Sequence, residues 1–198
     1  MIQLFINQDK KESHHFTVRD KQGQILFLIQ GNWGREGDSV NLFSLDANLL
    51  LQAKQVNMSP FFKFDLFHRQ KKLGAFRKHP GFFGLRDAFF TVQPYDWIIR
   101  GDFEKLDFTA FEKEQEIFKV SKLLKYGNAL YSLKVKCEED IQLASLLSIL
   151  LDHYSRKKQG DRAYQEVNEG QYNLGFLNYR IHSKLFLNLD KEKLVNKK

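Results

Sequence analysis

The fold of this 198-residue chain depends on one stretch, Asp140-Ile141-Gln142-Leu143-Ala144-Ser145-Leu146-Leu147-Ser148-Ile149-Leu150-Leu151-Asp152-His153-Tyr154. Acidic residues precede the stretch, and Arg156, Lys157 and Lys158 follow it ahead of Gly160, as the helix dipole and helix stop signals require. The pattern therefore predicts a helix, and its apolar residues leave no polar face. Such a helix is buried on every side, either in a large protein core or in a bilayer.

The length of the apolar run decides between these two environments. The eleven residues from Ile141 to Leu151 extend about 16 Å at about 1.5 Å per residue, whereas the hydrocarbon core of a bilayer is about 30 Å thick. The run is too short to span a membrane. We therefore expect a core helix over about residues 141–154, enclosed by protein.

The first 136 residues can supply the enclosing wall. Their hydrophobic alternation predicts short strands joined as hairpins, with turns centred near Gly23, Asn48, Lys72, Gly101, Gln115 and Gly127. No alternation of strands and helices is present, which argues against a nucleotide-binding α/β sheet. The single cysteine cannot form an intramolecular disulfide, so a hydrophobic core must hold the fold.

The order of six segments along the chain carries a family resemblance. They are Phe16–Gly23, Phe43–Asp46 before Leu49-Leu50, Trp97–Phe103 with Phe108 downstream, Ile117–Lys122, Tyr131–Val135 and the apolar helix ending in Leu151-Asp152. Together they resemble the LURP-one-related family of the tubby C-terminal-like superfamily, to which phospholipid scramblases are more distantly similar. The resemblance implies a mainly β fold: a closed antiparallel barrel of about twelve strands around the hydrophobic helix.

The resemblance ends near residue 158, which predicts two regions: the barrel with its helix (1–158) and a C-terminal extension (159–198). Residues 159–170 are polar and predict a linker. From Leu177 to Leu189 the apolar residues alternate with polar ones, which favours a strand or hairpin, although a helical pattern is also present. The apolar face of residues 172–189 predicts self-association or a protein partner.

The net charge of +7 is concentrated between Lys63 and Arg86, where seven basic residues accompany one acidic residue. A local basic patch attracts phosphate, on nucleic acid or at a membrane surface. The alternative is a solvated hairpin whose lysines discourage edge pairing. The candidate ligand-binding residues are Arg69, Lys71, Lys72, Arg77, Lys78 and Arg86.

Nothing in the sequence indicates catalysis, a cofactor or a metal site. The acidic residues after Cys137 oppose thiolate formation, and the six histidines have no ligand spacing. Asp96 and Asp102 are typical of turn aspartates that accept hydrogen bonds from backbone amides. In the glycine-rich segment 31–38 we expect a flexible connection anchored by Trp33, and Phe82 and Phe83 of Pro80–Leu85 are either core residues or an exposed aromatic pair.

The leading hypothesis is a non-enzymatic barrel that binds an anionic phospholipid or phosphoinositide-like head group at a membrane surface. The lipid part of this hypothesis comes from the superfamily resemblance. The alternatives are a nucleic-acid-binding or regulatory scaffold that uses the same patch, and a protein-interaction module that uses the extension. The lone thiol and the missing export signal predict a cytoplasmic protein, peripheral to the membrane when lipid is bound.

Overall fold

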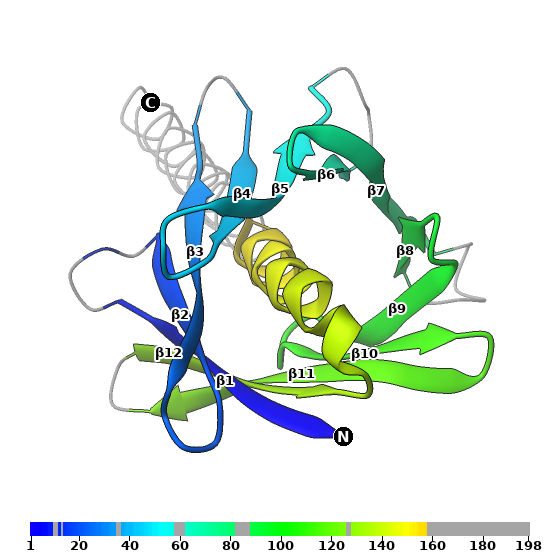
Figure 1. Cartoon of the computed structure of the whole chain (residues 1–198). Coiled ribbons are helices and arrows are strands. Elements are labelled where there is room, and N and C mark those ends of the chain that lie inside the picture. The colour runs from blue at the N-terminus through cyan, green and yellow to red at the C-terminus, as the bar shows by residue number, and fades with distance from the viewer. Residues whose placement is uncertain are drawn as a thin grey trace, which may run out of the picture. The chain divides into compact units, whose positions relative to one another are not determined.

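The alternating apolar residues of the first 136 positions form twelve antiparallel strands in the computed structural model of the chain (Figure 1). The structure describes residues 1–9, 12, 14–34, 37–57, 62–81, 88–125 and 128–157. The strands are β1 (Ile2–Gln8), β2 (His15–Arg19), β3 (Ile25–Asn32), β4 (Ser39–Phe43), β5 (Leu49–Gln55), β6 (Lys63–His68), β7 (Lys71–His79), β8 (Phe89–Gln93), β9 (Trp97–Asp102), β10 (Asp107–Glu112), β11 (Gln115–Lys125) and β12 (Asn128–Val135).

Each strand pairs with its neighbour in the sequence, and β1 pairs with β12 to close the barrel. Closure leaves no strand edge unpaired, which removes the usual site of edge-to-edge aggregation. One residue in two points inward along each strand, and the largest fully buried side chains are Tyr131 and five phenylalanines: Phe64, Phe76, Phe90, Phe108 and Phe118. The prediction of a closed antiparallel barrel of about twelve strands is confirmed.

The predicted helix lies inside the barrel. After a 3₁₀ turn, η1 (Glu138–Asp140), it runs over residues 141–157, three residues beyond the predicted end, and we call it the core helix. Residues 143–152 of the helix are buried on every side, including the serines Ser145 and Ser148, whereas Arg156 and Lys157 at its end are exposed. Within the described residues, no helix combines the length and apolar composition needed to cross a bilayer. The barrel wall therefore takes the place that lipid would take around an apolar helix.

The barrel has two ends, defined by the core helix. At the proximal end, where the helix begins, the connections are residues 20–24, 44–48, 69–70, 94–96 and 113–114. At the distal end, where the helix ends, the connections span residues 9–14, 33–38, 56–62, 80–88, 103–106 and 126–127. The distal connections are on average longer, and most contain residues outside the described part of the chain.

Two predicted turn positions are wrong. The turn predicted near Lys72 is Arg69-Gln70, both with positive φ, and Lys72 belongs to β7. The turn predicted near Gly101 is residues 103–106, because Gly101 lies in β9 opposite Phe108. A Cβ atom on Gly101 would lie 2.1 Å from the Asp107 carbonyl oxygen, so this glycine permits close strand approach rather than a turn.

Candidate anion-binding surface

Two basic side chains face each other on the outer surface of the barrel near the distal end. Lys63 of β6 lies directly opposite Arg77 of β7. The Lys78 amide donates to the Phe62 carbonyl at 2.9 Å, which makes Lys63 and Arg77 a non-hydrogen-bonded pair, with Cα atoms about 4.5 Å apart. Within the described part of the chain, neither side chain has a hydrogen-bond or ion-pair partner. Like charges in this position repel each other, so an anion that binds between Lys63 and Arg77 relieves the repulsion.

The row of outward side chains continues on β8. Thr91 lies opposite Arg77, and His79 follows Arg77 by two residues on the same face of β7. The His79 Nε2 atom is 2.9 Å from Thr91 Oγ1, and the imidazole stacks on the Phe89 ring with centroids 4.8 Å apart. Burial, and secondly the Arg77 charge, lower the pKa of His79 below its usual value of 6.5.

Lys78 points to the opposite face of β7 from Arg77. Its Nζ atom lies 5.0 Å from the centroid of the Tyr154 ring on the core helix. Phe62, Phe90 and Phe103 surround the same ring, with centroids 4.8, 5.3 and 5.5 Å away. Lys78 thus covers an aromatic cluster at the distal rim, where a cation–π contact favours its charge.

The other predicted cations lie at the proximal end of the same hairpin. Arg69, Lys71 and Lys72 are exposed, and Lys72 Nζ forms an ion pair with Asp65 Oδ2 at 2.7 Å. Arg77 follows Lys72 by five positions along β7, which is about 16 Å at about 3.3 Å per residue. The predicted residues on this hairpin therefore do not form one patch: Arg77 and Lys78 lie at the distal end on opposite faces of β7, and Arg69, Lys71 and Lys72 lie at the proximal end beside the Asp65 carboxylate.

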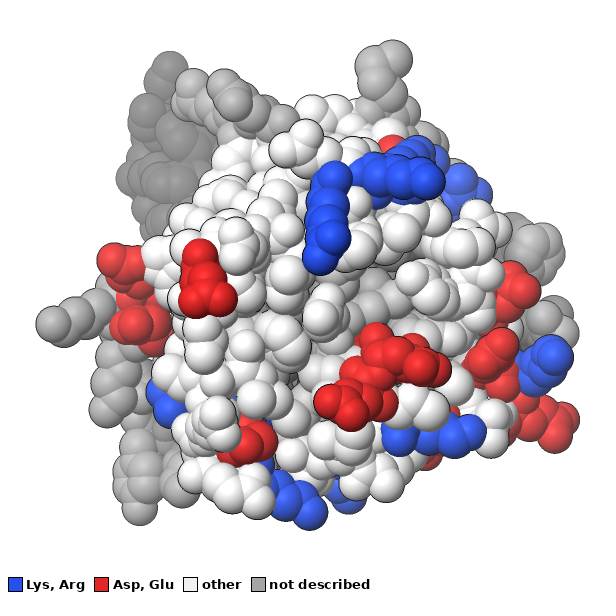
Figure 2. Space-filling view, viewed as in Figure 1, with Lys and Arg blue, Asp and Glu red and all other residues white. Residues whose placement is uncertain are grey.

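Figure 2 shows the distribution of charge over one face of the barrel. Lys and Arg side chains gather over the region of β5–β7, apart from the acidic side chains near the start of the core helix. The first helical turn supplies acidic residues Glu138, Glu139 and Asp140. In the lower part of this view Lys and Arg side chains lie beside acidic ones, so only the group over β5–β7 stands apart. Arg86 and the segment 82–87, which includes Phe82 and Phe83, lie outside the described residues.

Sequence reasoning missed Thr91 and His79 and left Lys63 out of the ligand-binding set. A two-residue turn at Arg69-Gln70 alone would place Lys63 opposite Phe76. A bulge between Leu66 and Phe67 shifts the register by one residue and brings Arg77 opposite Lys63 instead. The alternation of apolar residues could have located Lys63, Arg77 and Thr91 on the outer face, but not their alignment.

A separate group of polar side chains fixes the end of the core helix to the wall. Lys122 Nζ on β11 is 3.0 Å from Asp152 Oδ1, and His153 Nε2 is 2.8 Å from Asp38 Oδ2. The Trp33 ring stacks on the His153 imidazole, with centroids 3.7 Å apart and the planes at 3°. The expectation that Trp33 anchors segment 31–38 is confirmed, although Gly31 and Asn32 belong to β3 rather than to a loop.

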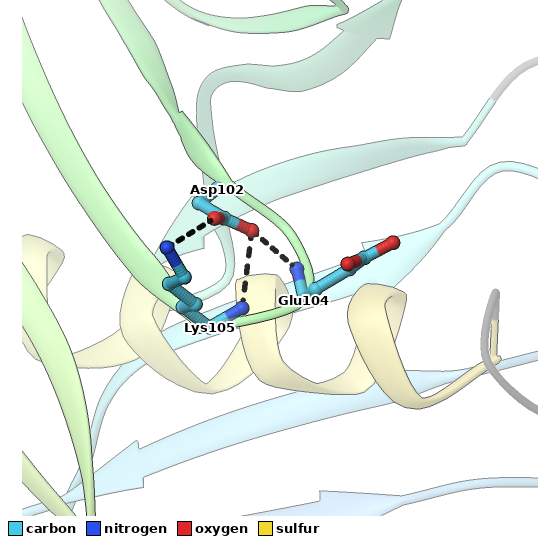
Figure 3. A network of polar contacts seen from close by, with 3 residues as sticks. All are labelled: Asp102, Glu104 and Lys105. Atoms are coloured by element: carbon cyan, nitrogen blue, oxygen red, sulfur yellow. Dashed lines mark hydrogen bonds and ion pairs between the residues drawn. The ribbon is translucent and has the colours of Figure 1, made fainter.

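Asp102 accepts backbone hydrogen bonds in a turn, as predicted (Figure 3). Its Oδ1 atom accepts from the amides of Glu104 at 2.8 Å and Lys105 at 3.1 Å. These bonds, led by that from Lys105, lower the pKa of Asp102. Asp102 is therefore a turn residue. Among the described residues, no group of three or more His, Cys, Asp or Glu side chains could hold a metal ion.

Comparison with known proteins concerns the barrel. The profile of the LURP-one-related family matches residues 2–152. The uncharacterized protein YxjI of Bacillus subtilis (strain 168) is 27% identical over 156 residues, which cover 77% of this chain and 93% of the relative. The X-ray structure of a protein from Arabidopsis thaliana is similar with a TM-score of 0.53 at 13% identity, covering 77% of this chain and 92% of that chain. At this identity, the structural likeness supports the fold alone.

Proposed function

The chain belongs to the LURP-one-related family, whose profile covers residues 2–152, and from this premise we propose that it is a non-catalytic barrel that binds anionic phospholipid head groups at a membrane surface. The observation that carries the proposal is the pair Lys63 and Arg77, which oppose each other without a described acidic partner. Because neither cation is in an ion pair with a described residue, a phosphate group can bind to both without breaking an existing ion pair.

The distribution of charge along the sequence supports the same surface. Residues 1–155 contain 21 Lys and Arg against 19 Asp and Glu, yet residues 63–86 alone contain seven against one. The remainder of the barrel is therefore slightly acidic, and β6–β7 with the following segment is its basic region. Residues 156–198 contain ten basic and five acidic residues, which adds attraction to an anionic leaflet.

Vesicle sedimentation tests the proposal with a matched pair of variants. Vesicles of phosphatidylcholine alone are compared with vesicles that also contain phosphatidylserine. We expect pelleting only with the anionic vesicles. The double substitution Lys63→Gln with Arg77→Gln should weaken binding by about 2 kcal/mol, because each basic residue near the surface contributes about 1 kcal/mol.

The control removes the same charge from the other end of the same hairpin. Lys71→Gln with Lys72→Gln should weaken binding less, because Lys72 is already paired with Asp65. Equal pelleting on neutral and anionic vesicles contradicts the proposal. If the protein instead binds duplex DNA, with an affinity that falls steeply as the salt concentration rises, the result supports the alternative of a nucleic-acid-binding scaffold.

A further inference from the structure

We propose that the outer face of β6–β8 holds a proton-dependent subsite for a phosphate monoester, in which Lys63, Arg77 and Thr91 bind the anion and protonation of His79 strengthens the binding. This inference rests on the proposed function, since it names the head-group chemistry and the regulation of the same surface. The ligand comes either from a lipid such as phosphatidic acid or from a soluble phosphate ester.

The register of three strands places the subsite in one row. Lys63 is opposite Arg77, and Arg77 is opposite Thr91. Neighbouring strands lie about 4.8 Å apart, so the row spans about 10 Å, which suits one tetrahedral oxyanion and its donors. The alternate residues Phe64, Phe76 and Phe90 are buried inside the barrel, which leaves the row on the outer face.

The hydrogen bond between His79 and Thr91 couples a proton to this row. A neutral imidazole can accept the Thr91 hydroxyl hydrogen at Nε2, and the hydroxyl then has no hydrogen to give an anion. An imidazolium has N–H groups at both ring nitrogens, so Thr91 Oγ1, at 2.9 Å, must accept. The hydroxyl hydrogen is then released for the anion. One proton thus adds both a positive charge and a donor.

The surrounding charges set the direction of the pH dependence. Arg77 is the charge that acts on the His79 pKa, Lys63 lies opposite Arg77 on β6, and Asp65 of β6 is paired with Lys72. On β8, Phe89 and Thr91 are uncharged. Burial and Arg77 lower the pKa of His79 when the site is empty, and a bound anion raises it. Binding therefore takes up a proton, and affinity rises as the pH falls through the His79 titration.

Sulfate is the probe, because it stays doubly charged while histidine titrates. NMR titration of the full chain follows the His79 imidazole and the Thr91 amide at about pH 5.5 and about pH 7.5. We expect sulfate to bind severalfold more tightly at the lower pH, since a shift of about one pKa unit on binding gives a gain of at most about tenfold. His79→Gln should keep the affinity measured at the higher pH and lose the increase.

Two further variants separate this relay from general charge. His68→Gln, at an exposed position at the other end of β6, should keep the pH dependence. Thr91→Val should leave the affinity at the higher pH nearly unchanged and reduce the gain on acidification, because the Thr91 hydroxyl donates to the anion only when His79 is protonated. A wild-type affinity that does not change with pH, or a His79→Gln protein that keeps the change, overturns the subsite.

Failure of the subsite differs from failure of the proposed function. If Lys63 and Arg77 are needed for pelleting on phosphatidylserine vesicles while sulfate binding is independent of pH, membrane binding stands and the subsite is wrong. If sulfate binding does depend on pH and on His79, binding of the native protein to vesicles that contain phosphatidic acid is compared with its binding to soluble glycerol phosphate. Tighter binding to the vesicles supports a lipid as the source of the monoester, and equal binding supports a soluble ester.

Discussion

Backbone hydrogen bonds hold strand connections at both ends of the barrel, and at the distal end side chains of the core helix also bond to the wall. The proximal turn at residues 44–48 illustrates the first kind: the Ala47 amide donates to the Ser44 carbonyl at 3.1 Å, and the Ser44 amide donates to the Asn48 carbonyl at 2.9 Å. The distal pairs Lys122–Asp152 and Asp38–His153 illustrate the second kind.

The two ends of the core helix also differ in the contacts that hold them. Its start lacks a side-chain cap on Cys137, and the acidic residues there repel one another. Burial, and then the charges of Glu139 and Glu112, raise the pKa of Asp140. Its end is held by two polar contacts and by the Trp33 ring. The distal contacts therefore add polar and aromatic attachment points to the apolar packing that holds the helix in the barrel.

The largest expected effect comes from breaking the buried distal ion pair. Lys122→Met should lower the free energy of unfolding by about 3 kcal/mol, because Asp152, 3% exposed, is left with its charge buried. Urea denaturation measures the change. The matched control is Lys119→Met on the same strand, whose ion pair with Asp107 is exposed and should cost less than about 1 kcal/mol. Equal losses would mean that burial does not distinguish the two pairs.

A smaller loss is expected at the neighbouring helix position. His153→Phe keeps a ring against Trp33 but removes the contact between His153 Nε2 and Asp38 Oδ2, which should cost about 1–3 kcal/mol. Hydrogen exchange should show faster opening of β3 and β4 near Trp33 and Asp38, with little change at the proximal turns. Tyr154→Phe is the control: no described residue bonds to its hydroxyl group, so stability should change by less than about 0.5 kcal/mol. If hydrogen exchange becomes faster to the same extent throughout the barrel, His153 does not hold the distal end locally.

The smallest effect is expected at the proximal end and has the opposite sign. Asp140→Asn should raise stability at neutral pH by a few tenths of a kcal/mol, since this partly exposed carboxylate is screened by water. The raised pKa means that wild type loses stability as the pH rises through the Asp140 titration, so the difference should vanish near pH 3. Thermal unfolding across this range measures it.

Asp102 provides the contrasting control. Its pKa is lowered in the folded state by the Lys105 and Glu104 amides, so its contribution is present above its unfolded pKa and is lost as the pH falls through its folded pKa. Asp102→Asn should therefore lower stability at neutral pH and have no effect in strong acid. If Asp140→Asn and Asp102→Asn change stability in the same direction at neutral pH, the assignment of Asp140 as repelled by its neighbours and of Asp102 as hydrogen-bonded is wrong.

Much of the fold could be predicted because the relevant signals are local. An apolar run from Ile141 to Leu151 with no polar face demands a wall on every side, whatever else the chain contains. Likewise Gly23, with φ of 85°, marks its hairpin turn because glycine, which has no Cβ atom, adopts a positive φ without steric strain. Gly101 shows the limit of this reasoning, since a glycine can also mark a close approach between strands.

The candidate surface was only half predictable. The sequence alone determined that the barrel surrounds the helix and that its basic residues are concentrated between Lys63 and Arg86. Only the tertiary structure decided which of them meet: one bulge brings Arg77 opposite Lys63 rather than Phe76, and the strand length separates both from Lys72. Similarly, Asp38 meets His153 across 115 residues of chain. Hydrophobic period and turn preference are properties of neighbouring residues, whereas strand register and barrel closure depend on contacts that form only when distant segments pack together.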